Sequence, residues 1–127
     1  MAIARQSEAS LIKPFRNAMV LPGIAGATIE AGELVTLQSD GYWDPGIGTG
    51  VVKNVGVSVK AAAVGDPVEV VLHGGIECVT GATPGAIIYV SDTAGEPAET
   101  AGTKSAVVGF ALSATAIFVN SQTVAFA

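Results

Sequence analysis

The residues of this chain that could do chemistry are few, and two of them lie in one short stretch. His73 is the only histidine and Cys78 the only cysteine among the 127 residues. A nucleophilic cysteine needs a neighbouring base, and His73 lies upstream of Cys78 across a glycine pair. Zinc takes three or four ligands, which two residues cannot supply. We therefore predict a buried, unreactive thiol and no metal site.

Two glycine-rich segments resemble parts of known catalytic loops. Residues 46–50, Gly-Ile-Gly-Thr-Gly, could suggest a phosphate-binding loop, but such a loop needs a helix after it. A valine-rich segment follows here instead. His73-Gly74-Gly75 resembles part of an esterase oxyanion loop, yet the chain contains no Gly-x-Ser-x-Gly elbow. We predict a flexible loop at residues 46–50, and a strand that ends at His73 before a glycine turn.

The carboxylates are scattered at predicted turns and strand edges. Glu96 and Glu99 lie in a polar segment, where acidic side chains ordinarily serve solubility. A glycosidase-like acid pair would need a cleft rich in aromatic residues, and the chain has a single tryptophan. The sequence therefore predicts no catalytic residue, no cofactor and no enzymatic activity.

The elements that carry these residues are predicted to be strands, because the dominant hydrophobic period is two. Glycine and proline recur between the apolar segments as turn signals. Residues 87–90 are apolar on both faces, as in a central strand. We predict an all-β domain, a small barrel or sandwich, without an amphipathic helix. The predicted strands are residues 54–60, 67–72, 87–90, 107–112 and 117–120, and residues 123–126 could close the sheet.

Part of the chain repeats itself at an offset of 53 positions (85 − 32 = 53). Residues 32–59 match residues 85–112, and Gly56 aligns with Gly109. The motifs that match at this offset are residues 32–37 with 85–90 and residues 55–59 with 108–112, and between them Asp44-Pro45 matches Glu96-Pro97 at an offset of 52 (96 − 44 = 52). We predict two similar halves, about residues 32–72 and 85–120, within one β domain that spans residues 18–127.

The composition favours a chain that binds other protein chains. Half of the residues are apolar, only 13% are charged and the net charge is −5. A domain of this size cannot hide so many apolar side chains, so some should face another chain. The six cations are not clustered, which disfavours nucleic acid, and no apolar run approaches the ~20 residues of a membrane span. The N-terminus has no apolar core typical of a secretory signal.

Residues 1–17 belong to neither half and are predicted to form an extended arm. They carry three of the six cations and show no hydrophobic period. The arm could be a solvated tail or could lie on an acidic partner; in the second case residues 1–16 should be mobile in the free protein. The candidate contact residues of the arm are Ile3, Arg5, Leu11, Ile12, Lys13, Phe15 and Arg16.

Tyr42 and Trp43 form the only aromatic pair of the sequence. They follow a predicted turn at Asp40-Gly41. Large aromatic residues at such a place could cap the end of a barrel, or they could anchor an interface. Both alternatives remain open at this stage, and both residues are candidate contact residues.

Six motifs occur in a characteristic order: residues 31–35, 55–57, 65–70, 74–76, 84–90 and 108–111. Over residues 18–120 this order resembles the small capsid decoration (cement) proteins of tailed bacteriophages. The resemblance implies a β-barrel or β-tulip core that assembles as homotrimers on the outer capsid surface, after a stage in the host cytoplasm. It also implies an N-terminal arm that reaches across the shell.

The function expected from the resemblance is to stabilise the expanded shell by bridging major capsid proteins. The partners would then be the major capsid protein and further copies of this chain, with no role for nucleic acid or membrane. The alternative is a phage surface module for attachment to a host or a carbohydrate. That alternative predicts an exposed aromatic platform, for which only Tyr42 and Trp43 are available.

Overall fold

The computed structural model describes residues 3–16, 18–45, 54–103 and 106–120. This part of the chain is all β, with an antiparallel sheet that curls into a half-barrel, a second two-stranded sheet and a single 3-10 turn, η1 (Ala9–Leu11). None of the described helical residues forms a helix long and apolar enough to cross a membrane. The predicted loop at residues 46–50 and the predicted strand at residues 123–126 lie outside the described residues.

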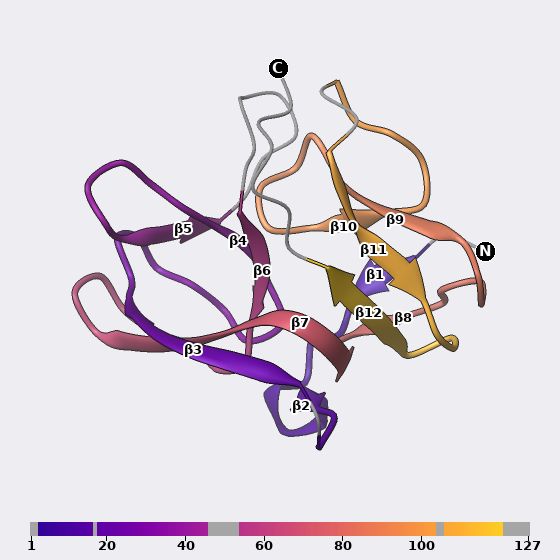
Figure 1. Cartoon of the computed structure of the whole chain (residues 1–127), viewed down its shortest axis with the longest axis horizontal. Helices are drawn as coiled ribbons and strands as arrows, with labels where there is room; N and C mark the ends of the chain where they lie inside the picture. The colour runs from indigo at the N-terminus through magenta and orange to yellow at the C-terminus, as the bar shows by residue number, and fades with distance from the viewer. Residues whose placement is uncertain (1–2, 17, 46–53, 104–105, 121–127) are drawn as a thin grey trace.

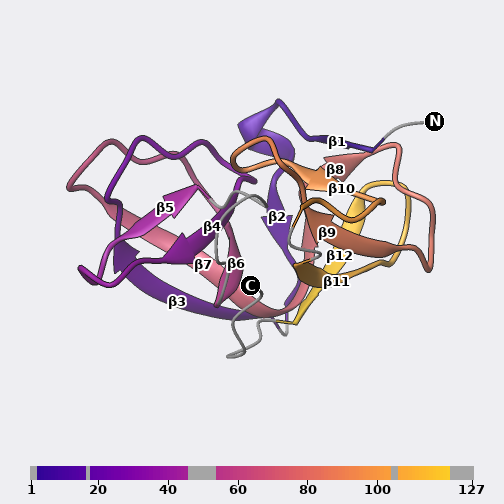
Figure 2. The same ribbon diagram turned by 90° about the horizontal axis from the view of Figure 1, so that it is seen from above.

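The strands follow one another with short connections. They are β1 (Ala4–Arg5), β2 (Lys13–Pro14), β3 (Met19–Ile24), β4 (Leu34–Leu37), β5 (Trp43–Pro45), β6 (Val55–Ser58), β7 (Pro67–Glu77), β8 (Val79–Thr80), β9 (Ile87–Val90), β10 (Pro97–Ala98), β11 (Val107–Ala111) and β12 (Ala116–Asn120). All the strands expected within the described residues are present. Figure 2 shows the small β1–β8 sheet on one side of the molecule and β3 on the other.

The long strand β7 runs through both halves of the molecule (Figure 1). His73 of β7 pairs with Met19 of β3 and also with Asn120 of β12, so β3 and β12 lie on opposite edges of β7. At Val70 and Val71, β7 pairs with β3 on one edge and with β6 on the other. Strands β6 and β12 therefore follow each other along the same edge of β7.

This arrangement divides the sheet into two five-stranded units that share β7. In the first unit, residues 19–72, the neighbours run β3, β7, β6, β4, β5. In the second unit, residues 73–120, they run β7, β12, β11, β9, β10. The order is the same, because the first half of β7 ends the first unit and its second half begins the second unit.

The pairing within the two units keeps the offset that the sequence predicts. Val35 pairs with Gly56 in the first unit, and Ile88 pairs with Gly109 in the second, each partner displaced by 53 positions. The backbone hydrogen bonds agree: Gly32 N donates to Ser58 O at 2.8 Å, and Gly85 N donates to Ala111 O at 2.8 Å. The predicted correspondence of Gly56 with Gly109 is confirmed.

One part of the predicted alignment is wrong. Trp43 pairs with Leu37 in the first unit, and Pro97 pairs with Val90 in the second. Pairing thus places Pro97 where the first unit has Trp43, rather than aligning the two acidic-proline dipeptides. The turns before these strands match at the new offset, because Gly41 (φ 87°) and Gly95 (φ 78°) both adopt the left-handed conformation that glycine tolerates.

The glycine pair at residues 74–75 does not end a strand, as the sequence suggested, because β7 continues to Glu77. A Cβ at Gly74 would lie 2.7 Å from the backbone of Ala18, and one at Gly75 would collide with the ring of Phe15. The two glycines make room for the N-terminal segment that crosses the strand. His73 is therefore a mid-strand residue.

The core consists of two clusters. The larger cluster joins both units, since it holds Leu34 and Val57 of the first together with Ile88 and Val119 of the second. The smaller cluster lies within the first unit and is closed by Trp43. Its buried members are Ala25, Ile29, Val35, Trp43, Ala62, Val68 and Val70.

Candidate interaction surface

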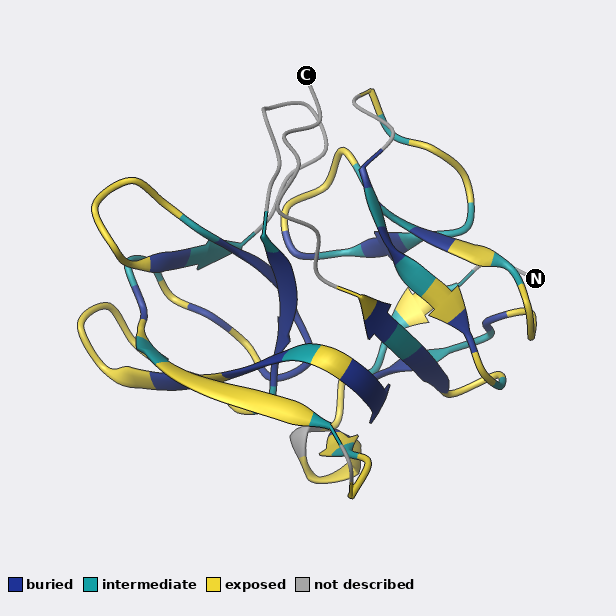
Figure 3. Ribbon diagram, in the orientation of Figure 1, coloured by how far each residue is buried: buried dark blue, intermediate teal, exposed yellow. Residues whose placement is uncertain are grey.

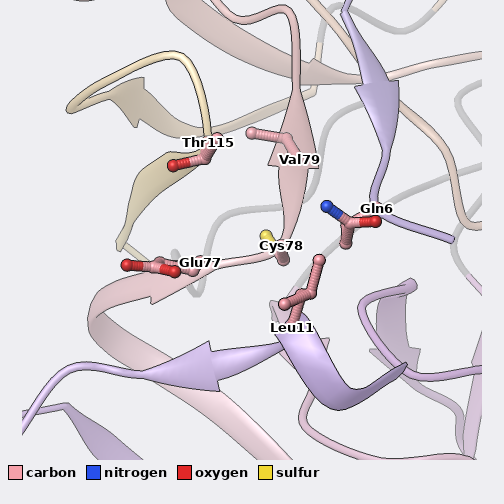
Figure 4. A pocket seen from close by; sticks show the side chains of 6 residues that line it. All are labelled: Gln6, Leu11, Glu77, Cys78, Val79 and Thr115. Atoms are coloured by element: carbon pink, nitrogen blue, oxygen red, sulfur yellow. The ribbon is translucent and has the colours of Figure 1, made fainter. Parts of the chain in front are cut away.

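Cys78 is a buried thiol beside a small pocket. The pocket has a volume of about 100 Å³, and Figure 4 shows the Glu77 carboxylate pointing away from the thiol. Burial raises the pKa of the Cys78 thiol to about 12, so it stays protonated at neutral pH. His73 packs its ring edge-on against Phe118 at 5.1 Å between centroids. The prediction of a buried thiol is confirmed.

The described residues contain no group of three or more His, Cys, Asp or Glu side chains placed to hold a metal ion. One carboxylate is unusual, because Oδ1 of Asp44 is buried without a hydrogen-bond partner. A Cβ at Gly26 would lie 2.5 Å from this oxygen, which shows that a neighbouring loop backbone covers it. A single carboxylate oxygen offers no basis for a metal or catalytic site.

The most distinctive surface feature is a row of apolar side chains across the second unit. Ile87, Phe110 and Phe118 are direct cross-strand neighbours on β9, β11 and β12. Ile87 is 50% exposed, Phe110 is 44% exposed, and the rings of Phe110 and Phe118 stack at 5.4 Å. We call these three residues the exposed row.

The first unit contains the equivalent of this row, and there it is covered. Leu34, Val57 and Val71 are cross-strand neighbours on β4, β6 and β7. All three are buried in the larger core cluster. Because Leu34 and Val57 correspond to Ile87 and Phe110 at the offset of 53, the two rows occupy the same place in their units. We call Leu34, Val57 and Val71 the buried row.

The exposed row continues toward β3. Phe118 pairs with Gly75, and the ring of Phe15 lies over Gly75. His73 contacts Phe118 and pairs with Met19, which is 58% exposed. Figure 3 shows the exposed faces of β3 and of β11 on the same side of the molecule. A continuous apolar surface of this kind is typical of a binding site for another molecule.

At the first unit this surface opens into a hollow of about 400 Å³. Its apolar lining comes from strands β3, β4, β5 and β7, and it includes the edge of the otherwise buried Trp43. The residues around it are Met19, Leu21, Leu37, Trp43, Asn54, Leu72 and His73. We call it the hollow. Among the described residues around the hollow there is no carboxylate, lysine or arginine, so this part of its lining suits an apolar occupant.

Tyr42 and Trp43 differ in their exposure to solvent. Trp43 is buried, and its ring packs on Gly23 of β3, as expected for a residue that closes a core. Tyr42 is 45% exposed on the preceding turn. The two residues therefore do not form one exposed platform.

The N-terminal segment lies on its own chain rather than standing off as an arm. Arg5 of β1 pairs with Val79 of β8, and Lys13 of β2 pairs with Glu77 of β7. Ile12 is buried in the larger core cluster, and Ile3 packs against that cluster. Among the predicted arm contacts, Leu11, Lys13, Phe15 and Arg16 remain exposed. The expectation of a detached arm is thus not met in this structure.

Arg5 holds the segment to both units. Its guanidinium donates to Glu30 at 2.8 Å and to Glu96 at 2.9 Å, and it also reaches the backbone carbonyl of Ala31 at 3.2 Å. Glu30 precedes β4 in the first unit, and Glu96 precedes β10 in the second. Arg5 therefore bridges the two units from outside.

Comparison with known proteins leaves the family of the chain open. No family model matches the sequence, and no curated protein matches it.

Sequence inspection missed most of the apolar surface. Strand β3, Met-Val-Leu-Pro-Gly-Ile, lacks the alternation that predicts a half-buried strand, because both of its faces carry apolar side chains. The signal that could have found the exposed row was Ile87, since residues 87–90 are apolar on both faces. The structure buries Ile88 and Val90 and leaves Ile87 exposed.

Proposed function

We propose that this chain is a structural protein of a tailed bacteriophage that decorates the outer surface of the expanded capsid. In this proposal the half-barrel is part of a β-barrel or β-tulip core with a duplicated unit, and the chain acts as a homotrimer. The supporting observation is the continuous apolar surface of the exposed row and the hollow, on an all-β frame. Such a surface suits a protein whose work is contact with other chains.

The chain would stabilise the shell by mass action. A protein that binds only the assembled, expanded lattice shifts the equilibrium toward that lattice. The symmetry of the shell repeats each weak contact many times, so modest single contacts add up to a large stabilisation. The major capsid protein is the partner in this proposal, and the protein would reside on the virion surface after assembly in the host cytoplasm.

The position of residues 3–16 changes how an arm could take part. Ile12 and Arg5 are engaged within the chain, so they could contact a capsid protein only after the segment leaves its own sheet. Leu11, Lys13, Phe15 and Arg16 are exposed without such a change. The arm contact, if the shell uses one, therefore begins with these four residues.

The attachment module is the weaker alternative. It was expected to use Tyr42 and Trp43 as an exposed aromatic platform, and the burial of Trp43 leaves Tyr42 alone at that turn, while the exposed aromatic residues of the exposed row lie in a surface that continues with aliphatic side chains. We therefore argue the decoration function alone.

The test mixes the purified chain with expanded and unexpanded shells of the phage that carries its gene. The chain should sediment with expanded shells at a copy number fixed by the lattice, and should raise the temperature at which the shells break. Unexpanded shells serve as the control, because the binding surface between capsid proteins forms on expansion. Failure to bind expanded shells would refute the proposal.

A further inference from the structure

The packing of the first unit on the second shows which kind of surface covers a row such as the exposed row. The buried row of the first unit packs against the inner face of the second unit, where Ile88, Ile117 and Val119 lie in the same core cluster. The exposed row occupies the equivalent place on the second unit. The matching partner for it is therefore the inner face of a unit built like its own.

Within the part of the chain that the structure describes, one such inner face is accessible. That of the second unit is closed by the first unit of the same chain. That of the first unit, built on Val35, Val70 and Trp43, is closed only in part, because the hollow opens beside Trp43 and is lined there by residues of β3, β4 and β7. The hollow is thus the accessible counterpart of the surface that the buried row already uses.

We propose that the exposed row of one copy packs into the hollow of a second copy. The contact repeats between chains the packing of one unit on the next within a chain. It is head-to-tail, since it joins two different surfaces, and such contacts close into a ring when the rotation between copies allows it. The proposal rests on the self-association part of the proposed function and is independent of capsid binding.

The chemistry of the two surfaces agrees. Phe110 and Phe118 are aromatic side chains of the kind that anchor interfaces, and Ile87 extends them with an aliphatic group. The hollow offers Leu21 and Leu72 together with Met19, whose flexible thioether adapts to the shape of a partner. The described residues of both surfaces carry almost no charge, so docking of these residues removes apolar area from water without burying an unpaired ion.

The experiment uses two variants, Phe110→Glu on the exposed row and Leu21→Glu in the hollow. Each places a charge on a residue that is close to half exposed, so the fold should tolerate it. Analytical ultracentrifugation of the purified full chain should show that either variant alone self-associates at least about 30-fold more weakly than the wild type, the loss typical of a central interface anchor.

Mixing the two variants decides which surfaces meet. The Phe110→Glu chain keeps an intact hollow and the Leu21→Glu chain keeps an intact row, so an equimolar mixture should form a heterodimer with wild-type affinity for one contact and stop there. Formation of this heterodimer also shows that both variants are folded. If the row met a row, the Leu21→Glu chain alone would still self-associate, and if a hollow met a hollow, the Phe110→Glu chain alone would do so. Either result would show that the proposal is wrong.

A matched control places the same charge elsewhere. Val64 is 65% exposed on the connection between β6 and β7, and Val64→Glu should leave self-association unchanged. A wild-type chain that stays monomeric at the highest concentration would overturn the proposal. So would a Val64→Glu chain that dissociates as fully as the other two, because the effect would then follow from added charge alone. Neither outcome depends on whether the chain binds capsids.

Discussion

The two units of this protein have the same strand order, yet they bury their strands differently. In the first unit, β6 is buried along its whole length and β4 is buried at Leu34, Val35 and Thr36. In the second unit, β9 alternates between buried and more exposed residues, and β11 exposes Phe110 while it buries Val108 and Ala111. The difference comes from position in the chain, because the first unit has the second packed on its outer face. The duplication thus covers the outer face of the first unit and leaves the outer, apolar face of the second unit uncovered.

The units also differ in how they fill their inner faces. The first unit has a core cluster of its own, closed by Trp43. The second unit has Pro97 at the equivalent place, and its inner face is filled by the buried row of the first. Trp43 therefore fills the inner face of the first unit, whereas a neighbouring unit fills the inner face of the second.

The largest expected effect comes from removing this tryptophan. Trp43→Ala should lower the free energy of unfolding by about 3–5 kcal/mol, because it leaves a cavity in a small cluster that nothing else can fill. The matched change Pro97→Ala should cost less than about 1.5 kcal/mol, since it removes little volume. Urea denaturation of both variants measures the difference. Equal losses in the free energy of unfolding for Trp43→Ala and Pro97→Ala would contradict the proposed difference between the two positions.

A second pair of substitutions compares the two rows directly. Leu34→Ala should cost about 2–5 kcal/mol, since Leu34 is 1% exposed. Ile87→Ala, at the equivalent position, should cost less than about 1 kcal/mol in dilute solution, because half of the side chain already contacts water. Denaturation at low protein concentration provides the measurement. A loss at Ile87 as large as at Leu34 would mean that the exposed row is covered within the free chain.

Most of the strands, and the correspondence between the two units, could be predicted from the sequence. Hydrophobic period two predicted β6, β7, β11 and β12, and the repeated motifs indicated the offset at which β4 corresponds to β9. These features are local, since each depends on neighbours along the chain or on a motif that recurs. They indicate which strands form and which strands of the two units are equivalent.

The covering of the strands could not be predicted from the same features. Residues 34–37 and 87–90 have similar apolar patterns, yet the first segment is buried on both faces and the second on one. Which face of a strand is covered depends on how the two units pack on each other, and this packing cannot be inferred from a local sequence pattern. The N-terminal segment was mispredicted for the same reason, because Ile12 and Arg5 find their partners far away in the sequence.

The link between the units should depend partly on Arg5. Arg5→Gln removes its ion pairs to Glu30 in the first unit and Glu96 in the second. The side chain of Arg5 is mostly buried while Glu30 is exposed, so we expect a loss of about 1–2 kcal/mol at low salt and a smaller loss at high salt. Thermal unfolding at two salt concentrations measures it. A loss that salt does not change would indicate that packing, rather than charge, holds the segment.

The smallest expected effect concerns a buried carboxylate that the second unit lacks. Glu33 corresponds to Ala86 at the offset of 53, and it is nearly buried while accepting a hydrogen bond from Glu30 N at 2.8 Å. Burial raises the pKa of Glu33 above its usual 4.5, although that hydrogen bond and the charge of Arg5 act in the opposite direction. The fold therefore favours the neutral acid, and the ionised form at pH 7 is a small penalty.

Glu33→Gln should remove that penalty, because glutamine is neutral and its side-chain oxygen can still accept from Glu30 N. The variant should be more stable than the wild type at pH 7, by at most about 1 kcal/mol. A raised folded-state pKa means that the wild type loses its penalty as the pH falls through that value, so the advantage of the variant should shrink toward pH 4.5 and vanish below it. Glu33→Ala is the control: it also lacks the charge but leaves Glu30 N without its acceptor, and it should be less stable than Glu33→Gln at both pH values. Urea denaturation at pH 7 and pH 4 distinguishes these outcomes, and an advantage of Glu33→Gln that persists unchanged at the lower pH would rule out the ionised carboxylate as its cause.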